Sequence, residues 1–238
     1  MIPATIEQGA AGVADAVAKS VRYQGRKASR QGSEQRRQDI LDAAMRIVVR
    51  DGVRAVRHRA VAAEAGVPLS ATTYYFKDIE DLLTDAFTQY VERSAAYMAK
   101  LWANTEELLR DLIAQGDSSP ESRSRLANVL ARMMTEYVQK QLSNRREHLM
   151  AEQAFRQEAL LTPRLANLVS AQQAILLRGA GQMLQVLGSR HPAQDAKVLT
   201  AIVDHMEYQA LLGTVPSNNE AEMFAILHRY MQLVLASA

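Results

Sequence analysis

The chain has 238 residues, of which 48% are hydrophobic and 23% charged, a balance typical of a globular protein. It contains no cysteine, which excludes disulfides, zinc–cysteine sites and thiolate nucleophiles. No run of 18 apolar residues occurs, and residues 9–21 lack the basic start of a signal peptide. We therefore expect a cytoplasmic protein with no membrane partner.

Basic charge is concentrated in the first third of the chain. Residues 1–77 carry 13 Lys and Arg against 7 Asp and Glu, a net charge of +6, whereas residues 78–238 carry 15 against 19, a net charge of −4. A basic nucleic-acid-binding head on a separate body would give this asymmetry. Chance variation among solvated charges would explain it equally well.

Residues 1–33 favour a flexible basic arm, because the stretch around residues 22–37 combines like charge with few apolar side chains. The cations at the end of this stretch are expected to act as a non-specific tether to phosphates rather than as readers of bases: Arg26, Lys27, Arg30, Arg36 and Arg37.

From Ser33 onward apolar residues recur at helical spacing, with Ser33 as a candidate cap and Gly52 as the end of this first helix. Two short helices are predicted next, over residues 57–65 and 69–75, joined by Ala65-Gly66-Val67-Pro68. This pattern suits a helix-turn-helix. Ala62 permits close packing, Gly66 permits a turn with positive φ, and Val67 fills the angle between the helices.

The second short helix carries Ser, Thr and Tyr side chains that can reach duplex DNA. Ser and Thr hydroxyls can bond bases or phosphates, a Thr methyl can touch thymine, and Tyr hydroxyls can reach phosphates. Such a helix reads the major groove in known helix-turn-helix proteins.

The rest of the chain also has helical periodicity and shows no strand pattern. Asp78 is a candidate N-cap for a helix that ends near Trp102. Pro120, Pro163 and Pro192 stand where helices can begin. Further helices are predicted near residues 105–115, 121–143, 146–160, 164–188, 192–213 and 219–236.

Residues 36–83 resemble the DNA-binding head of the TetR family of one-component bacterial repressors. The resemblance lies in Ile40-Leu41-Asp42-Ala43-Ala44, Val61-Ala62-Ala63-Glu64-Ala65-Gly66-Val67, Tyr74-Tyr75-Phe76 and Glu80-Asp81-Leu82-Leu83. The chain departs from the family pattern at Arg57-His58, which stand in place of Thr, and at Ser70, Thr72 and Thr73. The usual phosphate-binding lysine is absent at Ile79, and Lys77 is the candidate substitute.

The resemblance implies which residues of the head meet DNA. Arg59 would face the groove, the recognition helix would present its residues from Ser70 to Tyr74, and Tyr75 and Lys77 would meet the backbone. For Tyr74 packing is the alternative, and for Arg57 and His58 a solvated helix start. Phe76 and Val67 are expected in the core. The candidate DNA-binding residues are Arg36, Arg37, Arg57, His58, Arg59, Ser70, Ala71, Thr72, Thr73, Tyr74, Tyr75 and Lys77.

A head of three helices usually works as a dimer on two half-sites. The long helices after residue 164 carry more apolar surface than one small bundle needs, so part of it is a candidate for pairing two copies, although an intramolecular core is the alternative. The family resemblance implies a dimer formed by two C-terminal helices. We expect an all-α chain with an arm (1–33), a helix-turn-helix DNA-binding domain (34–78) and a larger helical ligand-binding and dimerisation domain (79–238).

A one-component regulator also needs a ligand pocket. Met and aromatic side chains recur at helical spacing in the body, and Met adapts to varied ligands, although such a stripe is more often plain core. Sparse charge among them favours an apolar or amphipathic small-molecule effector. The candidate ligand-binding residues are Tyr97, Met98, Leu101, Trp102, Met133, Met134, Tyr137, Phe155 and Met183.

Other function classes find little support in the sequence. The five histidines are scattered, no Glu-x-x-His pair occurs, and the phosphate-binding and dinucleotide-binding glycine patterns are absent. We therefore predict a transcriptional regulator that binds a double-stranded DNA operator as a homodimer, with no catalytic residues, cofactor or metal. Two alternatives remain: a helical adaptor for proteins, and an activator or co-repressor-dependent regulator.

Overall fold

The computed structural model describes residues 23–25, 31–114, 119–213 and 219–236. Within these ranges every regular element is a helix, as the sequence predicts. The arm expected over residues 1–33 lies outside the described residues except for residues 23–25 and 31–33, and the latter already belong to a helix.

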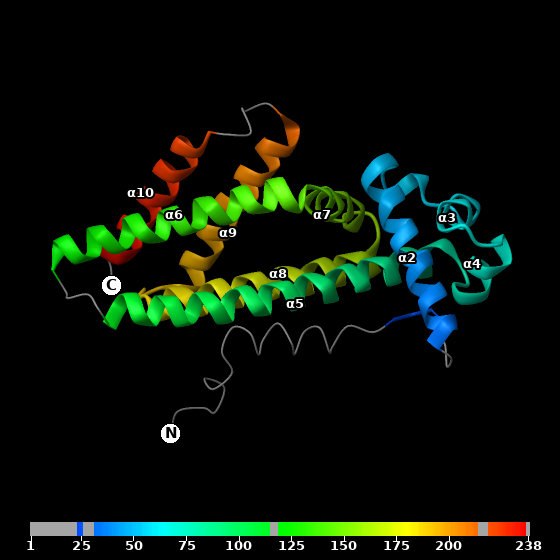
Figure 1. Cartoon of the computed structure of the whole chain (residues 1–238), viewed down its shortest axis with the longest axis horizontal. Helices are drawn as coiled ribbons and strands as arrows, with labels where there is room; N and C mark the ends of the chain where they lie inside the picture. Colours follow the sequence, from blue (N-terminus) through cyan, green and yellow to red (C-terminus); the bar gives the residue numbers. More distant parts are fainter. Residues whose placement is uncertain (1–22, 26–30, 115–118, 214–218, 237–238) are drawn as a thin grey trace, which may run out of the picture. The chain divides into compact units, whose positions relative to one another are not determined.

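The first four elements are α2 (Gln31–Asp51), the short 3-10 helix η1 (Val53–Ala55), α3 (His58–Ala65) and α4 (Leu69–Tyr75), which lie together in Figure 1. Helix α2 begins two residues before the expected cap at Ser33. The Ser33 hydroxyl instead pairs with the Tyr75 hydroxyl at 2.7 Å, so it joins α2 to the end of α4.

Helix α5 (Ile79–Ala114) is one continuous helix of 36 residues, so the break expected after Trp102 is wrong. The polar residues in that stretch fit inside a helix, because the Thr105 hydroxyl donates to the Leu101 carbonyl at 2.8 Å. No glycine or proline interrupts the helix. At its start the Asp78 carboxylate accepts from the Asp81 amide at 2.8 Å, which confirms the predicted N-cap.

The remaining helices are α6 (Pro120–Asn144), α7 (Arg146–Ala159), α8 (Pro163–Val186), α9 (Pro192–Leu212) and α10 (Glu220–Ala236). Three of them begin at a proline, as expected from a residue with a fixed φ and no amide hydrogen. Ser119 caps α6 by accepting from the Ser122 amide at 3.1 Å.

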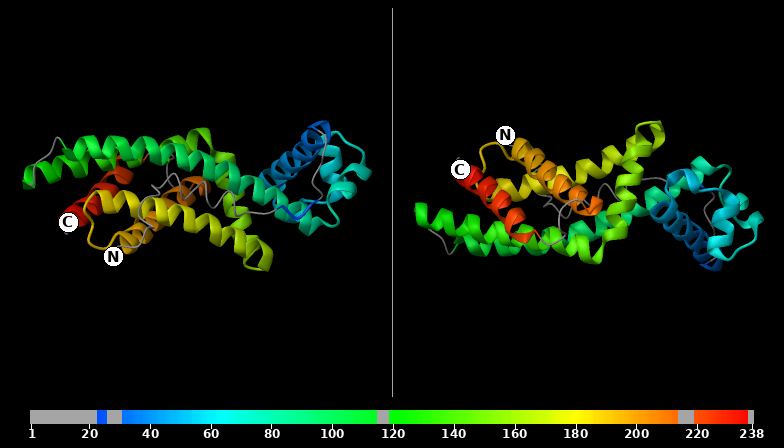
Figure 2. Two further views of the ribbon diagram at one scale, coloured as in Figure 1. Left: turned by 90° about the horizontal axis from the view of Figure 1, so that it is seen from below. Right: turned by 90° about the horizontal axis from the view of Figure 1, so that it is seen from above.

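The chain divides into two compact units. Of the described residues, those within 23–95 and 150–172 form one unit, and those within 96–149 and 173–236 form the other. The expected domain boundary at residue 78 falls inside the first unit. In the second unit α10 packs against α6 and α9 (Figures 1 and 2), around a buried cluster of Ala131, Val138, Met206, Met223 and Leu227.

Candidate nucleic-acid interface and effector site

Helices α3 and α4 are joined by the turn that the sequence predicts. Gly66 has φ 65° and ψ 31°, a left-handed conformation that glycine adopts without the steric penalty of a Cβ. The amides of Gly66 and Val67 donate to the carbonyls of Ala63 and Ala62, at 3.2 and 3.0 Å, and so close the end of α3. The turn therefore sets the direction of α4.

The inner face of this helix pair is apolar and fully covered. Val61, Ala62 and Phe76 are at most 4% exposed, which confirms Phe76 as core, whereas Val67 is only half-buried. Two residues expected on the DNA side belong to this inner face instead. Thr72 is completely buried and its hydroxyl donates to the Leu69 carbonyl at 2.8 Å, and Tyr75 is buried with its hydroxyl bonded to Ser33.

These two expectations were wrong for one physical reason. Positions three apart on a helix lie on the same face, so Thr72 and Tyr75 turn inward together. Neither side chain can reach DNA while the head keeps this packing.

The outer face of α4 carries polar side chains. Ser70, Thr73 and Tyr74 are exposed, and Ala71 is half-buried between them. The Tyr74 ring packs edge-on against Tyr75, with centroids 5.1 Å apart, yet the residue stays 53% exposed. Tyr74 therefore combines the two roles considered for it, a packed ring and a side chain open to solvent.

The segments that flank α4 in the sequence carry exposed cations. Arg57, Arg59 and Lys77 are exposed, and the Arg57 guanidinium donates to the Val56 carbonyl at 2.9 Å. Arg54 on η1 is also exposed and was missed, although its spacing to Arg57 and Arg59 was visible in the sequence. These charges are available to phosphates.

Not every cation of the head is available. Arg46 and Arg50 pair with Glu64 at 2.8 and 3.1 Å, and these hydrogen bonds lower the pKa of the Glu64 carboxyl. Arg36 is exposed, but its neighbour Arg37 is only 4% exposed.

Arg37 cannot be a phosphate tether. Its guanidinium lies 2.8 Å from the Asp85 carboxylate, which is fully buried, and 3.1 Å from Glu34. Arg37 lies three residues before Ile40 and four before Leu41, so helical spacing places it on the apolar face of α2. The expectation of DNA contact was wrong because a buried carboxylate holds this cation inside the head.

His58 fits neither role considered for it. It is half-buried, and both of its ring nitrogens are covered by the protein without a hydrogen-bond partner among the described residues. A solvated helix start or a phosphate contact would require these nitrogens to be accessible.

Most of the candidate effector residues lie in the second unit, where Tyr97 is exposed and the others are buried or half-buried. Met98, Trp102 and Met183 are buried, and Leu101 and Met133 are half-buried. Met134 and Tyr137 pack against the buried cluster around Ala131, and the Tyr137 hydroxyl lies 3.9 Å from the Met98 sulfur. These residues all belong to the second unit.

A polar group borders these residues. The Arg145 guanidinium stacks on the Tyr97 ring, 3.9 Å from its centroid, and donates to Gln141 at 3.3 Å. Burial, together with the positive charge of Arg145, lowers the pKa of His148 to about 3. His148 is therefore neutral under physiological conditions.

Phe155 does not join the other candidates. It is fully buried in the first unit, where its ring stacks on Phe87 with centroids 4.3 Å apart. Phe155 and Met183, which the sequence analysis grouped together, therefore lie in different compact units.

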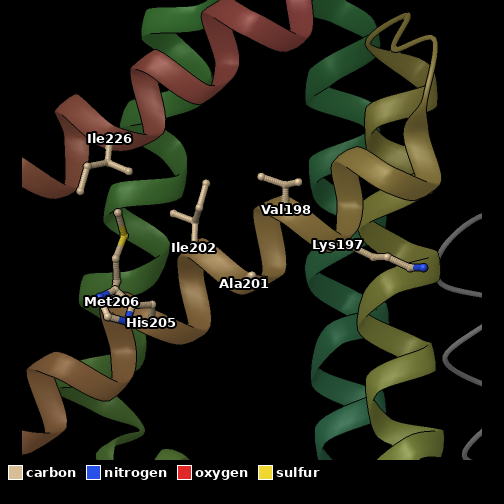
Figure 3. Close-up of a pocket in the computed structure, with 7 residues that line it drawn as sticks. All are labelled: Lys197, Val198, Ala201, Ile202, His205, Met206 and Ile226. Atoms are coloured by element: carbon tan, nitrogen blue, oxygen red, sulfur yellow. The ribbon is translucent and has the colours of Figure 1, made fainter.

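An open apolar groove of 520 Å³ lies on α9 and α10, and none of the predicted effector residues lines it. Figure 3 shows Val198 and Ile202 projecting from successive turns of α9, with Ile226 contributed by α10. Other apolar residues of the same two helices are strongly exposed: Tyr208, Leu212 and Leu233.

Among the described residues, none of the helices combines the length and the apolar character that a membrane span requires. Within the same residues, no group of three or more His, Asp or Glu side chains could hold a metal ion.

Two family models match the chain. Residues 40–86 match the model described as bacterial regulatory proteins of the tetR family, and residues 121–233 match the tetracyclin repressor-like C-terminal domain. Together they cover more than half of the chain. A comparison with curated proteins found no match.

Solved structures of similar proteins agree with these models. A TetR-family member from Streptomyces coelicolor is 28% identical, with 82% of this chain and 98% of that chain covered and a TM-score of 0.56. The multidrug binding protein EbrR in complex with ethidium gives 28% identity, the same coverage and a TM-score of 0.55.

A TetR-family regulator from Rhodococcus sp. shares the fold at 22% identity, with 84% and 99% coverage and a TM-score of 0.59. Proteins of this family are DNA-binding, ligand-responsive transcriptional repressors, and the helix-turn-helix described above is the part that binds DNA. The chain belongs to the TetR family of bacterial transcriptional regulators.

Proposed function

We propose that this protein represses transcription by binding a palindromic operator as a homodimer, and that an apolar or amphipathic small molecule releases it. The observation that carries the proposal is the polar outer face of α4, where Ser70, Thr73 and Tyr74 are exposed, together with the exposed cations Arg57, Arg59 and Lys77 of the same head. A short helix with such a face enters the major groove in helix-turn-helix proteins.

The residues divide into two groups by chemistry. Ser70 and Thr73 carry hydroxyls that can bond base edges, and Ala71 can make van der Waals contact with a thymine methyl. Tyr74 and the cations contact phosphates, which positions the helix without reading sequence. The cations of this second group are Arg36, Arg54, Arg57, Arg59 and Lys77.

Two copies join through the apolar face of α9 and α10. The exposed side chains include Val198 at 49%, Leu212 at 53% and Ile226 at 43%, together with the groove that runs between the two helices. A contiguous apolar surface of this kind is unusual on a monomer and marks an interaction site. A two-fold axis there would give two heads for two half-sites.

The effector binds in the second unit, next to Trp102, Met98 and Tyr97. These residues offer apolar and aromatic surface, and the flexible Met side chains can repack around a guest. EbrR, which shares this fold at 28% identity, binds ethidium, a planar aromatic compound. We propose a planar, largely apolar effector for this chain, a regulatory rather than catalytic role, and a cytoplasmic location.

Selection of operator DNA tests the proposal. The purified protein would select duplexes from a library of genomic fragments, and footprinting would locate the bound sequence. We expect a palindrome, and the Thr73→Ala variant is expected to bind it about tenfold more weakly, since loss of a base contact costs ~1–3 kcal/mol. The control is Ser143→Ala, an exposed hydroxyl on α6. No preference for any fragment over random duplex would refute the proposal.

A further inference from the structure

Residues 23–25, which precede α2 in the sequence, contact the head partly through their backbone amides. The amides of Gln24 and Gly25 donate to the two oxygens of the Asp85 carboxylate, at 2.6 and 2.9 Å. Asp85 lies in the second turn of α5 and is fully buried. One carboxylate therefore accepts hydrogen bonds from a segment that is about sixty residues away in sequence.

The same carboxylate also holds α2. The Arg37 guanidinium donates to Asp85 at 2.8 Å, and its central carbon lies 4.4 Å from the centroid of the Tyr23 ring and 5.8 Å from that of Phe76. Each of these contacts involves a different element: the segment before α2, helix α2, and the residue that follows α4. The Asp85–Arg37 pair thus joins the segment before α2, helix α2, helix α5 and the residue that follows α4.

Further along α5 the Tyr23 hydroxyl donates to Glu92. Burial and the Glu92 carboxylate raise the pKa of the Tyr23 phenol above its ordinary value, so it remains a donor. Residues 23–25, which we name the strap, are therefore fixed to α5 at two places about two turns apart.

The strap requires a glycine at its third position. A Cβ on Gly25 would lie 2.7 Å from an Asp85 carboxylate oxygen and 2.9 Å from the Phe76 ring. Both neighbours are completely buried, so neither can move aside. Any side chain at residue 25 would therefore push the strap away from Asp85.

We infer that Asp85 is a positioning residue for DNA binding: it docks the strap, holds Arg37, and thereby fixes α2 and the end of α4 on the first turns of α5. This inference rests on the proposed function. Phe76, which lies under the strap, directly follows the last residue of the recognition helix α4. The orientation of the outward face of α4 therefore depends on how Phe76 is held.

The strap contacts the part of α5 that belongs to the first unit, which continues into α5 as far as Ala95. Asp85 and Glu92 both lie in this part of the helix. The head and the first half of α5 are therefore expected to move as one body, and any bending of α5 between head and effector site to fall after this half.

Gly25→Ala is the sharpest test, because Asp85→Asn would leave Arg37 without its buried counter-ion and would endanger folding. Gly32→Ala is the matched control, since a Cβ at Gly32 meets no atom within 4 Å. Hydrogen exchange of the Gln24 amide reports docking of the strap. The ratio of affinities for a selected operator and a random duplex reports positioning of α4.

We expect Gly25→Ala to accelerate exchange of the Gln24 amide at least tenfold and to reduce the affinity ratio about tenfold. Binding to random duplex should stay unchanged, because it depends on charge and no charge is altered. Gly32→Ala should change neither value. Unchanged exchange in Gly25→Ala would refute the docking, and faster exchange with an unchanged ratio would refute the positioning role. A wild-type protein without sequence preference would instead refute the proposed function, while the exchange result would still test the strap.

Discussion

Gly179 in α8 packs directly against the single tryptophan of the chain, and this contact gives a quantitative prediction. A Cβ at Gly179 would lie closer than 3.0 Å to three carbons of the Trp102 ring, and the ring is only 6% exposed. Gly181, two residues further along α8, offers a comparison within the same helix. A Cβ there meets Pro192 and Ala196 at 3.6 Å and beyond, which is ordinary contact.

Both Gly→Ala changes gain ~0.5–1 kcal/mol, because alanine loses less backbone entropy in a helix. Only Gly179→Ala also overpacks the core, at a cost of ~1–3 kcal/mol. The propensity gain cancels in the comparison. We therefore expect the free energy of unfolding of Gly179→Ala to be lower than that of Gly181→Ala by ~1–3 kcal/mol.

Urea unfolding followed by Trp102 fluorescence measures this difference, at one fixed protein concentration because association stabilises an oligomer. The emission of folded Gly179→Ala should also shift, since the indole ring has to move. Equal unfolding free energies together with an unchanged emission spectrum would refute the packing of Trp102 on α8.

Three further predictions concern charge, pH and association. Arg59→Gln should weaken binding to every duplex and reduce the slope of log affinity against log salt by ~0.9 per lost phosphate contact. The control is Arg123→Gln, at an exposed position on α6, which should leave the slope unchanged. Equal slopes for the two variants would contradict a role for Arg59 in DNA binding. His148 has a folded pKa of about 3 against 6.5 unfolded, so the unfolded chain binds the proton first and stability is lost as pH falls below 6.5. Between pH 7 and pH 5 the wild type should lose about 2 kcal/mol more unfolding free energy than His148→Gln, and parallel losses in urea titrations would argue against a buried neutral His148. Ile226→Glu should convert the dimer to a monomer in sedimentation experiments while Ser143→Ala does not; a dimeric Ile226→Glu would exclude this face as the interface.

Local features such as turns and helix starts could be predicted from the sequence because they depend on neighbouring residues. Gly66 has the positive φ that the turn requires, and Asp78 and Pro120 start their helices as expected. Capping and turn formation involve groups only a few residues apart, so the sequence carries them directly.

For three residues of the head, residue type and helical spacing point to different roles. Arg37, Thr72 and Tyr75 each lie at helical spacing from core residues, yet their chemistry suggested contact with DNA. Residue type indicated one role and helical periodicity another. Periodicity was correct in all three cases, because a helix turns a given position inward whatever side chain it carries.

The sequence by itself determined that the chain is helical, where most helices begin, and which short helix follows the glycine turn, since these depend on contacts within a few residues. Only the tertiary structure decided that Asp85 receives the backbone of Gln24 and Gly25 and the guanidinium of Arg37. It also separated Phe155 from the other effector candidates and formed the apolar groove on α9 and α10. Such contacts join residues far apart in the chain, and their partners are fixed only when the helices pack.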